Sequence, residues 1–102
     1  MPLPIFIDRH RSAGVPSAVR HQLHLEAARG LVDEHGIQAL GHWITNGVIY
    51  CVLRAPSREA VCRHHAERGL PCDDVHPIAD LDRVTHAIAE LWPGDQYADI
   101  TS

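Results

Sequence analysis

The residues of this chain that could do chemistry are its histidines and the carboxylates near them. The 102-residue sequence contains nine histidines. Asp8 and His10 are two residues apart, so on a strand they share one face, roughly 6.6 Å apart. His21 and His24 are three residues apart and are therefore neighbours on the surface of a helix. Imidazole and carboxylate ligands suit nickel, zinc, cobalt or copper, so these pairs predict a site for a divalent transition metal.

Each pair also has a simpler interpretation. Asp8 and His10 would form an ion pair as readily as they would bind a metal, and most histidine pairs on helices are exposed polar residues. By the same reasoning we expect the isolated histidines His35, His76 and His86 not to be ligands. Spacing alone therefore does not decide between the simpler interpretations and a metal site. The choice depends on which of these residues the helices and strands bring together.

Residues 3–8 (LPIFID) are apolar and branched, which is typical of a strand. Apolar residues recur every fourth position from residue 17 to residue 34, which predicts a helix that ends before Gly36. Residues 37–45 and 48–54 read as two strands, and the Asn46-Gly47 pair between them is the strongest short signal for a hairpin. A second helix is expected over residues 58–68, capped by Ser57, and a last strand over residues 73–79.

This order of elements predicts an α+β fold, the ferredoxin-like βαββαβ arrangement, with an antiparallel sheet and two helices on one face. We expect that domain to span residues 1–79. Residues 80–102 form a C-terminal extension, in which an apolar stripe predicts one amphipathic helix over residues 80–92. An open second sheet face in so small a domain would expose apolar surface, so we also expect a homodimer.

The predicted topology gathers several histidines at one end of the sheet. The end of the first strand carries Asp8 and His10, the first helix begins near His21, and the second strand carries His42. The second helix ends at His64 and His65, which diverge by about 100 degrees around the helix, so only one of the two can face a given site.

Composition excludes several other classes of protein. The net charge is −4 and no Lys/Arg cluster is interleaved with aromatic residues, so we expect no nucleic-acid partner. No apolar run approaches the length of a membrane span, and charge appears early at the N-terminus, so we expect a cytoplasmic protein with no membrane partner.

The chain has three cysteines, Cys51, Cys62 and Cys72. Because three is an odd number and no Cys-x-x-Cys spacing occurs, we expect the cysteines to be reduced. Cys51 lies in an apolar strand and is expected to be a buried small residue rather than a ligand.

Several segments occur in a characteristic order along the chain. They are Phe6-Ile7-Asp8-Arg9-His10, a helix with a histidine near its middle, Tyr50-Cys51-Val52-Leu53, Ala55-Pro56-Ser57, and Glu59-Ala60-Val61 with His65 four residues later. Together they resemble a family of small bacterial nickel-binding proteins that have a ferredoxin-like fold. The resemblance covers residues 3–79.

The resemblance implies a dimer that coordinates nickel at its surface and sequesters or buffers it. Asp8 and His10 match the family's Asp-x-His on the first strand, and His65 matches its histidine on the second helix. His24 corresponds to the histidine on the first helix. Residues 27 and 28 are alanines, whereas members of the family usually carry an aspartate about three residues after that histidine. The loss of this carboxylate would weaken metal binding or change its selectivity.

Two other functions compete with metal binding. One is an enzyme in which two ferredoxin-like sheets enclose a small apolar substrate and His10 or His42 acts as general base. Such an enzyme needs an enclosed pocket, which a sheet face crowded by Phe6, Trp43 and Tyr50 would not leave. The other is a regulatory or interaction module in which the histidines are incidental. The chain has neither a paired nucleophile nor a cofactor fingerprint, which counts against the enzyme. Metal binding is preferred because of the family resemblance and the convergence of histidines at one end of the sheet.

Overall fold

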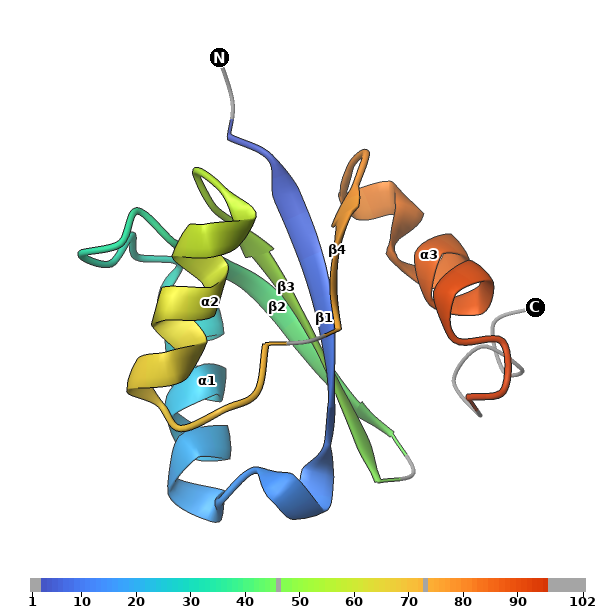
Figure 1. The fold of residues 1–102 in the computed structure, drawn as a ribbon, viewed down its shortest axis with the longest axis horizontal. Coiled ribbons are helices and arrows are strands. Elements are labelled where there is room, and N and C mark those ends of the chain that lie inside the picture. Colours follow the sequence, from blue (N-terminus) through green and yellow to red (C-terminus); the bar gives the residue numbers. More distant parts are fainter. Residues whose placement is uncertain (1–2, 46, 73, 96–102) are drawn as a thin grey trace.

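The computed structural model describes residues 3–45, 47–72 and 74–95, which form one four-stranded sheet flanked by helices on both faces (Figure 1). The elements are β1 (Ile5–Arg11), α1 (Ser17–Arg29), β2 (Gln38–Thr45), β3 (Val48–Arg54), α2 (Arg58–Glu67), β4 (Val75–Ile78) and α3 (Val84–Leu91). The strand order is β2-β3-β1-β4, and every neighbouring pair is antiparallel. The predicted ferredoxin-like α+β architecture is therefore confirmed, together with its C-terminal helix.

The helices form two separate layers. α1 and α2 cover one face of the sheet, and α3 lies against the other (Figure 1). Alternation along β1 sends Ile5 and Ile7 toward α3, where they pack with Val84 and Ile88. Asp8 and the other even-numbered residues of β1 face α1 and α2. The C-terminal helix α3 thus covers the sheet face that has no helix in the predicted βαββαβ arrangement.

Phe6, Trp43 and Tyr50 were considered together as residues that would crowd one sheet face, but they lie on two different faces. Phe6 packs on the α2 side with Val61, whereas Tyr50 and Trp43 lie in the cluster on the α3 side. The expectation is wrong for Phe6 because it occupies an even position of β1, one residue out of phase with Ile5 and Ile7. The α3 side is nonetheless filled, since Tyr50 and α3 pack there together.

The hairpin between β2 and β3 is confirmed. Thr45 pairs with Val48, which leaves a two-residue connection in which Gly47 has a left-handed φ of 84°. Asn46, which the sequence placed in this turn, lies outside the described residues.

The first helix ends earlier than predicted, at Arg29. Gly30 adopts a left-handed φ of 62°, and its N–H donates to the carbonyl oxygen of Glu26. A glycine in this conformation terminates the helix six residues before Gly36, the expected stop. The other elements begin and end within four residues of their predicted limits. None of the helices in the described part of the chain has the length and apolar character that crossing a bilayer requires.

Two of the three cysteines form a disulfide, so the expectation of reduced cysteines is wrong for this pair. Cys62 on α2 is bonded to Cys72 in the segment before β4, and their Cα atoms are 5.3 Å apart. They are ten positions apart in the sequence, a spacing that matches no recognisable motif. Packing of α2 over the sheet brings them together. Cys51 remains free and is buried, as predicted.

Candidate metal centre

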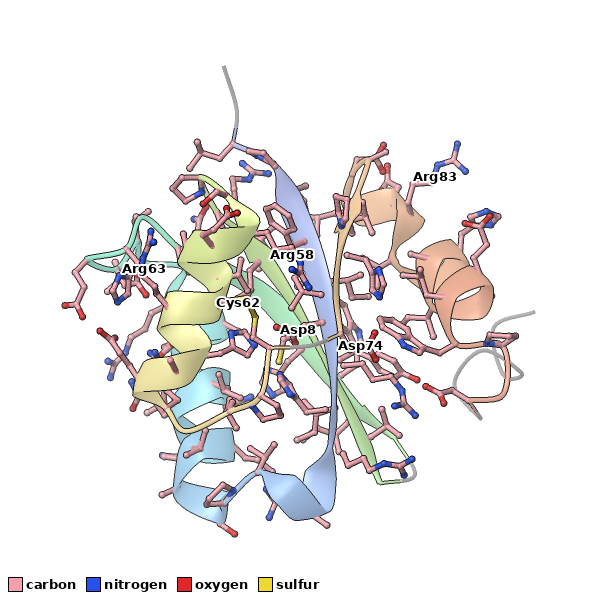
Figure 2. All side chains as sticks on the ribbon, in the orientation of Figure 1. Asp8, Arg58, Cys62, Arg63, Asp74 and Arg83 are labelled. Carbon is pink, nitrogen blue, oxygen red and sulfur yellow. A yellow bond between two sulfur atoms is a disulfide. The ribbon has the colours of Figure 1, made fainter. Side chains whose placement is uncertain are left out.

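Asp8 and His10 lie on β1, which β3 and β4 flank on either side. Both side chains point to the sheet face that α1 and α2 cover, and Figure 2 shows Asp8 on the side of β1 that faces α2. Asp8 is 1% exposed and His10 is 5% exposed. Burial of a charged carboxylate costs free energy unless a positive charge or hydrogen-bond donors compensate it. The residues around Asp8 must therefore supply a positive charge or hydrogen-bond donors.

His65 reaches the same point from α2. The helix starts at Ser57, whose hydroxyl oxygen accepts a hydrogen bond from the backbone N–H of Ala60. Eight residues after this cap, His65 points into the protein and is 3% exposed. Its Nδ1 lies 2.8 Å from the carbonyl oxygen of Val61. Because a carbonyl can only accept, Nδ1 carries the proton and donates it, which leaves Nε2 available as a ligand.

Three potential ligand atoms converge on one buried point. His65 Nε2 lies 2.6 Å from Asp8 Oδ2, and His10 Nε2 lies 3.2 Å from Asp8 Oδ1. The two Nε2 atoms are themselves 3.2 Å apart. One ligand atom from each residue therefore falls within 4.8 Å of the others. This is the arrangement of ligands around a single small cation.

The electrostatics show that this point requires a positive charge. Burial raises the pKa of Asp8, but hydrogen bonds and charge interactions with His10 and His65 outweigh it and lower the pKa to about 2. Burial lowers the pKa of His65, but the Asp8 carboxylate outweighs this effect and raises it. The two pKa shifts have one cause, because the Asp8 carboxylate and a protonated His65 stabilise each other.

The close partners of the buried Asp8 carboxylate are the two imidazoles, one beside each of its oxygens. Two imidazoles and one carboxylate form a donor set that suits nickel, zinc, cobalt or copper better than magnesium or calcium. A cavity of about 290 Å³ lies beside the centre and is lined in part by His10, Arg11 and Pro71. The cavity provides a route by which an ion or a further ligand could reach His10.

The other predicted ligands lie outside this group. His24 on α1 and His42 on β2 contact each other, with ring centroids 5.3 Å apart and nearly perpendicular planes. Burial and the nearby His24 lower the pKa of His42. His21, one turn before His24, is exposed. The role of these three histidines in metal binding stays a prediction.

His64 faces away from the centre, as the 100-degree divergence of adjacent helix residues requires. Its Nε2 lies 3.6 Å from Glu26 and 3.5 Å from Asp33. Burial lowers the pKa of His64. Of the two candidate histidines at the end of α2, the structure therefore places only His65 beside Asp8.

A second group of potential ligands was not expected from the sequence. His35 Nε2 lies 2.9 Å from Glu67 and 3.8 Å from Glu34. Both glutamates are exposed, and this arrangement is common for surface ion pairs. Spacing could not reveal it, because Glu67 comes 32 residues after His35 and only packing of the α2 terminus brings it close.

Comparison with known proteins adds independent information. The sequence model of a family described as nickel responsive protein SCO4226-like matches residues 6–78. The crystal structure of SCO4226 from Streptomyces coelicolor A3(2) is similar, with a TM-score of 0.57 and 30% sequence identity. The similarity covers 74% of this chain and 96% of that chain. No curated protein matches the sequence significantly.

Proposed function

Since this chain belongs to the SCO4226-like family of nickel responsive proteins, we propose that it binds one divalent transition-metal ion through Asp8, His10 and His65. Nickel is the metal that the family description favours, and zinc, cobalt and copper suit the same donors. We further propose that the bound ion is buffered or sequestered rather than used in catalysis.

The observation that carries this proposal is the meeting of two imidazole Nε2 atoms and a buried carboxylate. The His65 tautomer presents Nε2 to Asp8, and the two Nε2 atoms lie 3.2 Å apart. With the proton on Nδ1 of both rings, the two Nε2 lone pairs would face each other and the carboxylate. A divalent cation satisfies all three groups at once, whereas a proton can satisfy only two.

The number of ligands favours reversible binding. Three protein ligands leave coordination positions open, unlike the four protein ligands of a closed structural zinc site. The cavity beside His10 gives the open positions access to solvent or to a small ligand. A site of this kind can take up and release its ion, as buffering requires.

The proposal is tested by calorimetric titration of the metal-free protein with nickel, zinc, cobalt and copper at pH 7.5 and pH 5.5. We expect saturable binding of one ion per chain at pH 7.5, and much weaker binding at pH 5.5 because protons compete for the imidazoles. His10→Ala and His65→Ala should each weaken binding at least about 100-fold, about 2.7 kcal/mol.

The matched control is His86→Ala, which removes an exposed histidine of α3 on the opposite face of the sheet. It should bind metal like the unmodified protein. Equal affinities for His65→Ala and His86→Ala would show that the ion binds elsewhere, and the proposal would be wrong. Circular dichroism of each variant confirms that a loss of binding does not come from unfolding.

A further inference from the structure

The Cys62–Cys72 disulfide is close to the proposed metal centre along α2. Cys62 comes three residues before His65 on this helix, so the two residues are neighbours on one side of it. Cys72 belongs to the connection between α2 and β4, which is described at residues 68–72 and 74. The bond therefore ties this connection to the helix that carries a proposed ligand.

The same connection forms part of the cavity beside His10. Pro71, directly before Cys72, lines this cavity of about 290 Å³ together with Asp74 and His10. The disulfide thus fixes the residue next to the cavity wall. A movement of Cys72 would therefore move the wall beside a proposed ligand.

Two backbone hydrogen bonds hold the ends of the connection. The N–H of Leu70 donates to the carbonyl oxygen of His65 at 3.0 Å. The N–H of Arg9 on β1 donates to the carbonyl oxygen of Asp74 at 3.3 Å. Cys72 lies between these two bonds, and the disulfide is its covalent link to α2. Opening the disulfide leaves the two hydrogen bonds in place and releases the covalent restraint between them.

We propose that the Cys62–Cys72 disulfide is a site of reversible reduction by small dithiols, and that its reduction speeds the release of the ion from the proposed metal centre. This inference rests on the proposed function and adds its regulation. The centre keeps the same three protein ligands in both states, and the cavity wall beside them changes.

The reaction is thiol–disulfide exchange, with the dithiol as reductant. One thiolate of the dithiol attacks a sulfur of the Cys62–Cys72 bond, which forms a mixed disulfide and releases the other cysteine as a thiolate. The second thiolate of the dithiol then closes a ring and releases the remaining cysteine. Two electrons pass from the dithiol to the protein, and the two protons that the dithiol loses end on Cys62 and Cys72. An external disulfide reverses the reaction.

The two cysteines are more accessible than the metal ligands. Cys62 and Cys72 are half-buried, whereas Asp8 and His65 are 1% and 3% exposed. A small thiol can therefore reach the disulfide without opening the core. Arg58 comes four residues before Cys62, on the same side of α2. A guanidinium nearby stabilises the thiolate of a leaving cysteine, which favours exchange.

The closed disulfide favours slow release of the ion. While Cys72 is held, Pro71 stays beside His10 and limits the cavity through which water and competing ligands approach the centre. Reduction lets this wall move away and also removes a restraint one turn before His65. Loss of the groups that position metal ligands commonly weakens binding by 10-fold or more, so we expect release about 10-fold faster after reduction.

The test measures the rate at which the nickel-loaded protein gives up its ion to an excess of a coloured chelator. The protein is used as oxidised, and again after treatment with dithiothreitol, which is removed by gel filtration without oxygen before nickel is added. We expect about 10-fold faster release from the reduced protein and a return to the slow rate after treatment with oxidised glutathione. Mass spectrometry after alkylation identifies the cysteines that were reduced.

Two variants serve as controls. Cys62→Ala/Cys72→Ala lacks the disulfide and both of its thiols, so it should release nickel at the fast rate with or without reductant. Cys51→Ser lacks the free cysteine but keeps the disulfide, so it should respond to reductant as the unmodified protein does. Circular dichroism of each form shows whether the fold is retained.

The outcomes separate this inference from the proposed function. Nickel binding that depends on His65 but is released equally fast, or more slowly, after reduction would overturn the inference and leave the proposed function intact. A disulfide that dithiothreitol does not reduce in the folded protein would overturn it too. Loss of the fold on reduction would also overturn it, because release would then come from unfolding. Absence of nickel binding in every form would overturn both proposals.

Discussion

At the scale of single residues, Asp8 and His65 respond to pH in opposite ways. Asp8 has a pKa of about 2 in the folded protein, below the ordinary 3.8, so its contribution to stability is present above pH 3.8 and is lost as the pH falls toward 2. The pKa of His65 is raised above 6.5, so its contribution is present below pH 6.5 and is lost as the pH rises through the raised value. The metal-free protein therefore gains most from this pair between about pH 4 and pH 6.5.

The low pKa of Asp8 predicts an acid transition that depends on this residue. Between pH 4 and pH 2 the metal-free protein should lose about 2 kcal/mol of unfolding free energy through protonation of Asp8. Asp8→Asn should lack this part of the pH dependence, because asparagine does not titrate. Urea unfolding in the presence of a chelator measures the difference, with the exposed Asp80→Asn as control. Equal losses in the unmodified protein and Asp8→Asn would contradict the low pKa of Asp8.

At the scale of elements, α2 is the helix that completes the centre, and it is held at three points along its length. Ser57 caps its first turn, the Cys62–Cys72 disulfide ties its middle to the segment before β4, and His65 meets Asp8 near its end. The disulfide lies one turn before His65, so it restrains the part of the helix that carries a proposed ligand.

Removal of the disulfide tests the importance of this restraint. Cys62→Ala/Cys72→Ala should lower the unfolding free energy by about 2–3 kcal/mol, because a loop of this length is no longer closed in the unfolded chain. Urea unfolding in the metal-free state measures the effect. Reductant should destabilise the unmodified protein to a similar extent and leave the double variant unchanged. A double variant as stable as the oxidised protein would show that the disulfide contributes nothing to the fold.

At the scale of the whole molecule, the two faces of the sheet differ in what they carry. One face carries the proposed metal centre beneath α1 and α2, and the other is covered by α3 through Val84 and Ile88. The open sheet face that favoured a homodimer is therefore absent from the described residues. The most exposed large apolar side chains described are Leu31, Val32 and Ile44, at 69%, 64% and 53%.

A homodimer consequently stays a prediction that requires a surface other than the α3 face. Sedimentation velocity over a range of protein concentrations, with and without nickel, should give a species of about twice the chain mass of 11.3 kDa. Ile44→Ser would lower the dimer fraction if the edge strand β2 takes part, because it removes exposed apolar surface. A mass of one chain at every concentration would rule the dimer out.

The Cys62–Cys72 disulfide is relevant to the redox state of the compartment in which the protein is found. Disulfides that persist are typical of oxidising compartments and are rare in the reducing cytoplasm. The cytoplasmic location expected from the sequence stays untested, and mass spectrometry of the protein alkylated directly in its native cells would determine the state of Cys62 and Cys72.

The sequence by itself determined the features that depend on near neighbours along the chain. Alternation along β1 placed Asp8 and His10 on one face, the Asn-Gly pair predicted the β2–β3 hairpin, and Ser57 predicted the start of α2. These patterns are reliable because strand alternation, turn conformation and helix capping each involve only a few consecutive residues. The order of these elements was sufficient to predict the ferredoxin-like sheet.

Only the tertiary structure decided which distant residues meet. The rotation of α2 selected His65 over His64, and packing of that helix joined Cys62 to Cys72. The placement of Cys51 against Asp8 depended on the register between β1 and β3. Helix rotation, strand register and layer packing result from burial of the whole apolar surface, and no short segment contains that information.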